Sequence, residues 1–236
     1  MNKLYYGDCL TILRDKIPKE SVDLIYLDPP FNSNREYNNI YKDETGRPLP
    51  DQVEAFNDTW TLDEERMRCI RQMPVLLREA GMDDSVAEFW KIWMHALRQT
   101  NPKLLAYLSY MVERLLYLRG ALAPTGSIYL HCDPTASHYL KVFMDGIFGH
   151  DNFQNEVIWK RTSAHSDAKT MAHVHDVILF YTKSSRFEYI QNFRPYDKEY
   201  IDKYYKHDDG DGRRYMDGPI TAKGLSGGGI PTNIEA

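Results

Sequence analysis

A short apolar run that stops at two prolines constrains the fold of this chain more than any other feature. Residues Val22–Leu27 read VDLIYL, which suits a strand buried on both faces, as in a parallel sheet. The strand must end at Asp28-Pro29-Pro30, because neither proline has a backbone N–H to donate to a strand ladder. Asp28 therefore directly follows a strand end, and open α/β sheets bind their ligands at the carboxyl ends of strands.

Helices and strands are expected to alternate along the chain, which favours an α/β sheet. Asp8 is placed to cap a helix over Cys9–Lys16. The clearest helix covers residues 103–122, where leucines recur at i, i+3 and i+4 spacing, and the tripeptide at 124–126 is expected to end it as a turn. The remaining expectations are a short strand at 4–6, a polar loop over 32–60, helical patterns within 63–100 with Trp90 and Trp93 in a local core, strands at 127–132, 156–161 and 176–183, a helix over 136–148, and no regular structure after 184.

The composition excludes several classes of protein without identifying a function. The 236 residues are 42% hydrophobic, which is enough for one large domain or a domain with an extension. No stretch is apolar enough to span a membrane, and the N-terminus lacks the pattern of a signal peptide. Cys9, Cys69 and Cys132 have no metal-like spacing, which predicts free thiols in a reducing cytoplasm. A net charge of −5 means that a surface for nucleic acid would have to be local.

The tetrapeptide Asp28-Pro29-Pro30-Phe31 has the parts needed to activate an amino group of a nucleobase. Such a nitrogen is a poor nucleophile, because its lone pair is delocalised into the ring. Two acceptors aimed at its N–H bonds, the Asp28 carboxylate and the Pro29 carbonyl, would draw it toward a tetrahedral shape and stabilise its developing positive charge. The rigid prolines would hold that geometry, and Phe31 would offer a flat face to an extruded base. A strand-ending turn without chemistry is the alternative.

The same tetrapeptide resembles the catalytic motif of the DNA amino-methyltransferases, in which Asp, Asn or Ser precedes Pro-Pro-aromatic. Residues 7–41 (GDCLTILRDKIPKESVDLIYLDPPFNSNREYNNIY) are similar to the N-terminal signature of the subgroup called class β. Residues 124–161 resemble the middle strands of that family, and residues 175–183 (HDVILFYTK) resemble a motif that walls its base pocket. The resemblance covers most of residues 1–185, with several blocks in the order of the family.

This resemblance implies an α/β, Rossmann-like sheet that uses S-adenosylmethionine, incomplete and with a helical insertion at about residues 43–102. Residues 1–185 would form the catalytic domain, and residues 186–236 would begin a target-recognition or linker region. The implied substrate is duplex DNA with a flipped target base. Aspartate at position 28 favours adenine N6, with cytosine N4 or a non-catalytic DNA-binding subunit of the same fold as alternatives. Restriction–modification, a cognate restriction endonuclease, a homodimer and a cytoplasmic location follow as expectations of the resemblance.

The roles of the family carry over to individual residues of this sequence. The catalytic set is Asp28, Pro29, Pro30 and Phe31, and Asp8 is expected either to contact the adenine of the cofactor or only to cap its helix. The substrate-binding candidates are Asn32, Lys160, Arg161, Phe180 and Tyr181. The alternatives for them are roles in a loop, on the solvent-exposed surface or in core packing. Histidines 165, 173 and 175 do not form a convincing metal site, and the family needs no metal.

One element of the family is not evident in this sequence. The family normally binds its cofactor with an aromatic-x-Gly-x-Gly turn after a strand, which in class β lies C-terminal to the catalytic loop. Residues 224–229 (GLSGGG) have no apolar strand before them and no amphipathic helix after them, so we interpret them as a flexible loop. The expectation is that the chain is truncated before the cofactor-binding turn and does not bind S-adenosylmethionine well on its own.

Overall fold

The computed structural model describes residues 2–30, 36–38, 54–57, 60–161, 174–191 and 195–218, with only the backbone of 36–38 and 54–57. The chain divides into two compact units, residues 1–188 and 189–236. The expected tetrapeptide partner Phe31, the candidate Asn32, histidines 165 and 173 and the glycines of 224–229 lie outside the described residues. The assignment of functional domains to the two sides of residue 185 remains a prediction.

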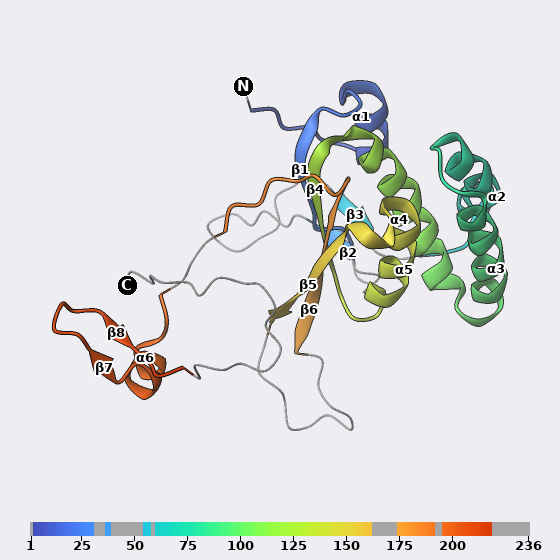
Figure 1. Ribbon diagram of the computed structural model, residues 1–236. Coiled ribbons are helices and arrows are strands. Elements are labelled where there is room, and N and C mark those ends of the chain that lie inside the picture. Colours follow the sequence, from blue (N-terminus) through green and yellow to red (C-terminus); the bar gives the residue numbers. More distant parts are fainter. Residues whose placement is uncertain are drawn as a thin grey trace, which may run out of the picture. The chain divides into compact units, whose positions relative to one another are not determined.

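A mixed sheet forms one side of the first unit (Figure 1). Among the described residues it has the order β1-β4-β6-β5, with β1 (Val22–Leu27), β4 (Leu122–Cys132), β6 (His175–Thr182) and β5 (Phe153–Lys160). β1 and β4 are parallel, whereas β6 is antiparallel to both β4 and β5. The expected α/β sheet is confirmed, and each of its four expected strands is found, with β4 beginning five residues before its predicted start.

Helices cover one face of this sheet in two successive layers (Figure 1). α4 (Pro102–Ala121) and α5 (Ser137–Phe148) pack against the sheet, and α1 (Cys9–Lys16) packs against α4. α2 (Glu64–Glu79) and α3 (Asp84–Thr100) pack on each other and on α4, and they form the helical part of the expected insertion. Trp90 is fully buried and its indole N–H donates to the Ile70 carbonyl at 3.1 Å, so the expected local core is confirmed.

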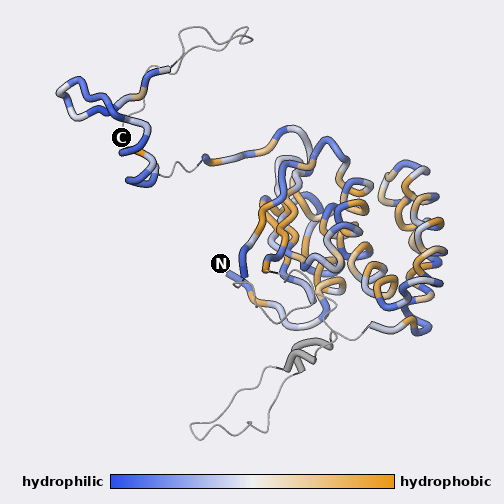
Figure 2. Tube along the Cα trace, turned by 90° about the horizontal axis from the view of Figure 1, so that it is seen from below, coloured by the Kyte–Doolittle hydropathy of each residue, from blue (hydrophilic) through white to orange (hydrophobic). Residues whose placement is uncertain are grey.

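Hydrophobic residues are concentrated in the sheet and helices of the first unit (Figure 2). Many of these hydrophobic residues belong to α4, which is apolar on nearly every side. It contributes Leu104, Leu108, Met111 and Leu115 to the core. A helix that is buried all round needs neighbours on all sides, and here the sheet, α1, α5 and the α2–α3 pair supply them. The described part of the second unit, by contrast, is mostly hydrophilic (Figure 2).

The expectation that β1 is buried on both faces is wrong for the described residues. Ile25 points into the core, but the residues Leu24 and Tyr26 on the other face are 60% and 55% exposed. The described helices cover only the face to which Ile25 belongs. An apolar strand sequence therefore does not by itself reveal how many faces are covered.

The expected turn at 124–126 is also wrong, because β4 continues through it. The pairing with β1 advances from Val22↔Leu122 directly to Leu24↔Ser127, so β4 carries extra residues in a bulge. Pro124 is accommodated there, because a bulged residue has no ladder hydrogen bond to donate. The Lys183 N–H donates to the Gly126 carbonyl at 2.9 Å, which ties the bulge to the end of β6.

Three further expectations are corrected by the structure. Residues 4–6 form no strand, and the polar segment 32–60 contains the antiparallel pair β2 (Glu36–Asn38) and β3 (Glu54–Asn57). The chain after residue 184 is not without regular structure. It forms α6 (Lys198–Tyr204) and a small hairpin of β7 (His207–Asp208) and β8 (Arg214–Tyr215), and a 3₁₀ turn at His150–Asn152 precedes β5.

Candidate active site

Asp28 lies at the carboxyl end of β1, where three strands bring polar side chains together. β1 and β4 are parallel, so their carboxyl ends share one edge of the sheet, and β6 is antiparallel, so its first residues reach the same edge. His131 Nδ1 lies 3.1 Å from Asp28 Oδ1, and His131 Nε2 lies 3.2 Å from Asp176 Oδ2. Arg161 Nη1 in turn contacts Asp176 Oδ1 at 3.2 Å. The result is a row of side chains in which acidic and basic groups alternate, from Arg161 through Asp176 and His131 to Asp28.

Solvent exposure falls steeply from Asp28 through His131 to Asp176 and rises again at Arg161, whose side chain is 54% exposed. The side chain of Asp28 is 64% exposed, that of His131 is 16% exposed and that of Asp176 is 4% exposed. The carboxylate of Asp28 is thus open to an incoming molecule, while the groups behind it are held in the protein. Charged groups are rarely buried unless they are paired, so the contacts of Asp176 account for its burial.

A cavity of about 200 Å³ opens beside Asp28. Its walls come from the end of β1 with Asp28-Pro29-Pro30, from Cys9 at the start of α1 and from one side of α4. The α4 residues are Tyr110, Met111, Arg114, Leu115 and Leu118. The cavity is smaller than the roughly 300–1,000 Å³ of pockets that enclose a drug-sized ligand, so it fits one part of such a molecule.

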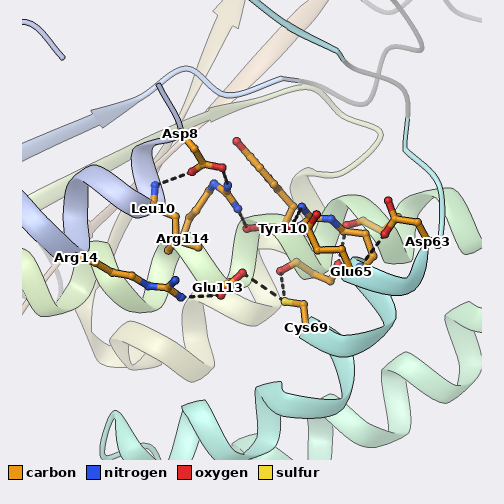
Figure 3. A network of polar contacts seen from close by, with 12 residues as sticks. Asp8, Leu10, Arg14, Asp63, Glu65, Cys69, Tyr110, Glu113 and Arg114 are labelled. Atoms are coloured by element: carbon orange, nitrogen blue, oxygen red, sulfur yellow. Dashed lines mark hydrogen bonds and ion pairs between the residues drawn. The ribbon is translucent and has the colours of Figure 1, made fainter. Parts of the chain in front are cut away.

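Asp8 belongs to a network of polar contacts between α1 and α4 (Figure 3). Its Oδ1 accepts a hydrogen bond from the Leu10 N–H at 2.7 Å, which is the expected helix cap. Its Oδ2 pairs with Arg114 Nη2 at 2.5 Å. The Arg114 guanidinium also lies 3.3 Å from the centre of the Tyr110 ring and donates to the Tyr110 carbonyl. The capping role is therefore observed, and a role in cofactor binding remains a prediction.

The buried end of Arg114 has unused hydrogen-bonding capacity. Within the described residues, Arg114 Nε is buried and has no hydrogen-bond partner. Arg114 also lines the cavity beside Asp28. A buried donor without a partner is costly, which adds weight to the contacts that Arg114 makes with Asp8 and Tyr110.

Phe180 and Tyr181 lie on opposite faces of β6, as successive strand residues must. The Phe180 ring stacks on Tyr129 of β4, with centroids 4.4 Å apart and planes at 10°, on the face that carries His131. Tyr181 is fully buried against α5, where its hydroxyl donates to Asp145 Oδ1 at 2.7 Å. Burial and this hydrogen bond raise the pKa of Tyr181. The position of Tyr181 matches the core-packing alternative.

Two of the remaining candidates, Lys160 and Arg161, lie at the end of β5. Lys160 is the last residue of β5 and is exposed, and Arg161 is exposed but directed to Asp176. Asn32 and Phe31 follow Asp28-Pro29-Pro30 outside the described residues. Within the described ranges, no three His, Cys, Asp or Glu side chains are grouped so that they could hold a metal ion, and no helix is long and apolar enough to cross a membrane.

Sequence reasoning missed His131 and Asp176, although both stand inside recognised blocks. A signal was available: His131 and Asp176 are polar residues at the ends of otherwise apolar strands. Two such residues on strands that reach the same sheet edge as Asp28 are candidates for its site. The sequence could not reveal that β6 is antiparallel and so brings its first residues to that edge.

Comparisons with known proteins agree on one family. A family model described as DNA methylase, for the N6 and N4 methyltransferases, matches residues 22–223. The StyLTI Mod subunit, a type III restriction–modification enzyme of Salmonella typhimurium strain LT2, is 31% identical over 99% of this chain and 32% of its own length. The type II methyltransferase M.KpnI of Klebsiella pneumoniae is 26% identical over 95% of this chain and 41% of its own. The chain thus spans less than half the length of these curated relatives.

Among solved structures, the cytosine-N4-specific PvuII DNA methyltransferase matches with a TM-score of 0.36 and 13% sequence identity. The match covers 84% of this chain and 60% of the PvuII chain.

Proposed function

The chain belongs to the N6/N4 DNA methylase family, and from this we propose that it carries the catalytic loop of an S-adenosylmethionine-dependent methyltransferase acting on adenine N6 in duplex DNA. One observation carries the proposal: an exposed Asp28 carboxylate, followed by Pro29 and Pro30, stands at the carboxyl end of a parallel strand beside a cavity. Ligands of α/β sheets bind at that edge.

The chemistry of Asp28 follows from what an amino group of a base lacks. Its carboxylate accepts one N–H of the target amino group, and the Pro29 carbonyl accepts the other, so that the nitrogen lone pair is freed from the ring. The carboxylate also stabilises the positive charge that develops on nitrogen as it gains a methyl group. Pro29 and Pro30 hold both acceptors in place, because their φ angles are fixed.

The cofactor is proposed to be S-adenosylmethionine, which supplies an activated methyl group. The residues present suit its adenine end. The α4 side of the cavity is mostly apolar, and Arg114 adds a positive group to that wall. Asp8 already contacts Leu10 and Arg114. A carboxylate has about four acceptor sites, so Asp8 could still accept a hydrogen bond from the adenine amino group.

The DNA contacts are proposed by residue. The target base would leave the duplex, since its amino group is out of reach inside the stack, and Phe31 would stack on it. Asn32 and Phe180 are proposed to border the base, and Lys160 and Arg161 to meet phosphates. Of the two cations, Lys160 suits this role better, because Arg161 already contacts Asp176.

The cellular role is proposed to be modification within a restriction–modification system. The names of the relatives StyLTI Mod and M.KpnI support this setting. A cognate endonuclease and a homodimer are proposed partners, and the cytoplasm is the proposed location. Cytosine N4 is the second candidate target, since the amino groups of the two bases need the same pair of acceptors.

Methyl transfer from labelled S-adenosylmethionine to duplex DNA tests the proposal. A protein that joins this chain to the cofactor-binding glycine turn of the family should label DNA, and nucleoside mass spectrometry should identify N6-methyladenine. Asp28→Ala should lower the rate by at least about 10²–10³-fold, the usual cost of a group that stabilises developing charge. Asp23→Asn, which neutralises an exposed carboxylate of the same strand, is the matched control and should retain the rate. If the Asp28→Ala variant labelled DNA at the normal rate, the proposed role of Asp28 would be refuted. If N4-methylcytosine were the sole product, the target would be cytosine.

A further inference from the structure

We propose that His131 is a positioning residue that orients the Asp28 carboxylate for its reaction, and that Asp176 anchors His131 from the protein interior. The inference rests on the proposed function, in which Asp28 accepts a hydrogen bond from the target amino group. It adds a residue of β4 and a residue of β6 to a site so far built from the end of β1.

The geometry places His131 between two carboxylates. Parallel pairing of Leu27 with Leu130 sets the next residues of both strands, Asp28 and His131, side by side. The two ring nitrogens then lie 3.1 Å from Asp28 Oδ1 and 3.2 Å from Asp176 Oδ2, both within hydrogen-bonding distance. One side chain therefore links an exposed carboxylate to a buried one.

An exposed carboxylate needs such a contact to be held still. Asp28 is 64% exposed, so without a fixed partner its carboxylate could rotate and offer either oxygen in many directions. The ring of His131 is largely buried, and Asp176 receives contacts from both His131 and Arg161. With Oδ1 in contact with Nδ1, the second oxygen of Asp28 is left to accept from a substrate. Errors of about 1 Å in such positioning can cost about 10²-fold in rate.

The proton required for this role is the one on Nδ1. Nδ1 can donate toward Asp28 Oδ1 both in the Nδ1–H tautomer and in the imidazolium. Only the imidazolium donates to Asp28 and Asp176 together. Arg161, on the far side of Asp176, provides a positive group for that buried carboxylate.

Two amide substitutions separate the contacts of His131. In His131→Asn the amide nitrogen takes about the place of Nδ1 and can still donate to Asp28. In His131→Gln it takes about the place of Nε2 and can donate only toward Asp176. We expect His131→Ala to lower kcat by about 10- to 100-fold with KM for DNA and cofactor nearly unchanged. His131→Asn should recover most of kcat, and His131→Gln should not.

The comparison of Asn with Gln keeps the test sharp even if His131→Ala fails to fold. Wild-type kcat in His131→Ala would overturn the proposal, as would a Gln variant at least as active as the Asn variant. A change in KM alone would also overturn it, because it would assign His131 to binding.

A second readout separates this inference from the proposed function. The ¹⁵N resonance of His131 Nδ1 should move in Asp28→Ala and stay in place in Asp23→Asn, whether or not the protein methylates DNA. Absence of methyl transfer by the wild-type protein that includes the cofactor-binding turn would reject the proposed function alone, and an unmoved Nδ1 resonance in Asp28→Ala would reject the positioning contact.

Discussion

Asp8 and Arg114 form an ion pair, with 2.5 Å between Asp8 Oδ2 and Arg114 Nη2, that joins the start of α1 to the middle of α4. The pair is asymmetric, because the Arg114 side chain is buried whereas that of Asp8 is half exposed. Arg114 also lies over the Tyr110 ring (Figure 3). Asp8 is therefore the outer member of a contact that compensates a buried charge in the wall of the candidate active site.

Substitutions of Asp8 should separate its capping role from its ion pair. Asp8→Asn keeps an oxygen that can accept from the Leu10 N–H but loses the charge facing Arg114. Asp8→Ala loses both, so the free energy of unfolding should fall in the order wild type, Asn, Ala. The cap contributes about 1 kcal/mol, and the half-exposed pair contributes about as much. Urea denaturation measures the order, and equal stability of Asp8→Ala and wild type would contradict it.

The three cysteines should differ sharply in reactivity. Burial raises the pKa of Cys69 and of Cys132 to about 12, whereas Cys9 is exposed and lines the cavity beside Asp28. Since the thiolate is the reactive form, iodoacetamide at pH 8 should label only Cys9 in the folded protein. S-adenosylmethionine should slow this labelling if it occupies the cavity. Peptide mass spectrometry identifies the labelled sites, and early labelling of Cys132 would contradict the fold around β4.

The same shifts set a direction for stability at high pH. Between the ordinary thiol pKa of about 8.5 and the folded value of about 12, Cys69 and Cys132 are protonated when folded and ionised when unfolded. The unfolded state then binds fewer protons, so these two thiols lower the free energy of unfolding as pH rises through that window. Cys69→Ala together with Cys132→Ala should flatten the decline in thermal midpoint above pH 8.5. An unchanged slope would contradict the burial of both thiols.

The apolar pattern of single segments predicts much of this fold. Val22–Leu27 is a strand as expected, and the leucine periodicity of the longest helix locates α4 to within one residue at each end. Such patterns are local, since each records which side of one element is apolar. They do not record what covers that side, which is why the exposure of Leu24 and Tyr26 was not predicted.

The sequence predicts only the part of the candidate site in which the catalytic residue stands directly beside the residues that end its strand. Asp28 was found because its proline neighbours end a strand and thereby place it at the sheet edge. His131 and Asp176 are 103 and 148 residues further along the chain, and the register of β1 with β4 and the reversed direction of β6 bring them to Asp28. Local rules likewise predicted a turn at Pro124, because they do not anticipate that a long strand can carry proline in a bulge.

Tyr181 provides a test of core packing against substrate contact. Tyr181→Phe keeps the ring but removes the hydroxyl that donates to Asp145, so the free energy of unfolding should fall by about 1–2 kcal/mol. Methyl transfer per folded molecule should stay at the wild-type level, because Tyr181 faces α5 and His131 lies on the other face of the sheet. Tyr189→Phe, at an exposed tyrosine, is the control for stability. Loss of kcat without loss of stability in Tyr181→Phe would return this residue to the base pocket.

Gly126 and Gly120 should respond in opposite directions to the same substitution. A Cβ added at Gly126 would lie 2.8 Å from Leu122 Cγ and 3.0 Å from the Val22 carbonyl oxygen, inside the bulge that joins β4 to β1. Leu122 is fully buried and the Val22 oxygen is backbone, so neither can move away cheaply. Gly126→Ala should therefore cost about 1–3 kcal/mol, the usual cost of overpacking.

Gly120 lies near the end of α4, and a Cβ added there would meet nothing within 4 Å. Alanine is the better helix former by up to about 1 kcal/mol, so Gly120→Ala should leave stability unchanged or raise it. Thermal and urea denaturation of both variants, six residues apart in sequence, measure the contrast. A Gly126→Ala protein as stable as Gly120→Ala would mean that β4 does not approach β1 closely at this bulge. The register that sets His131 beside Asp28 would then need to be revised as well.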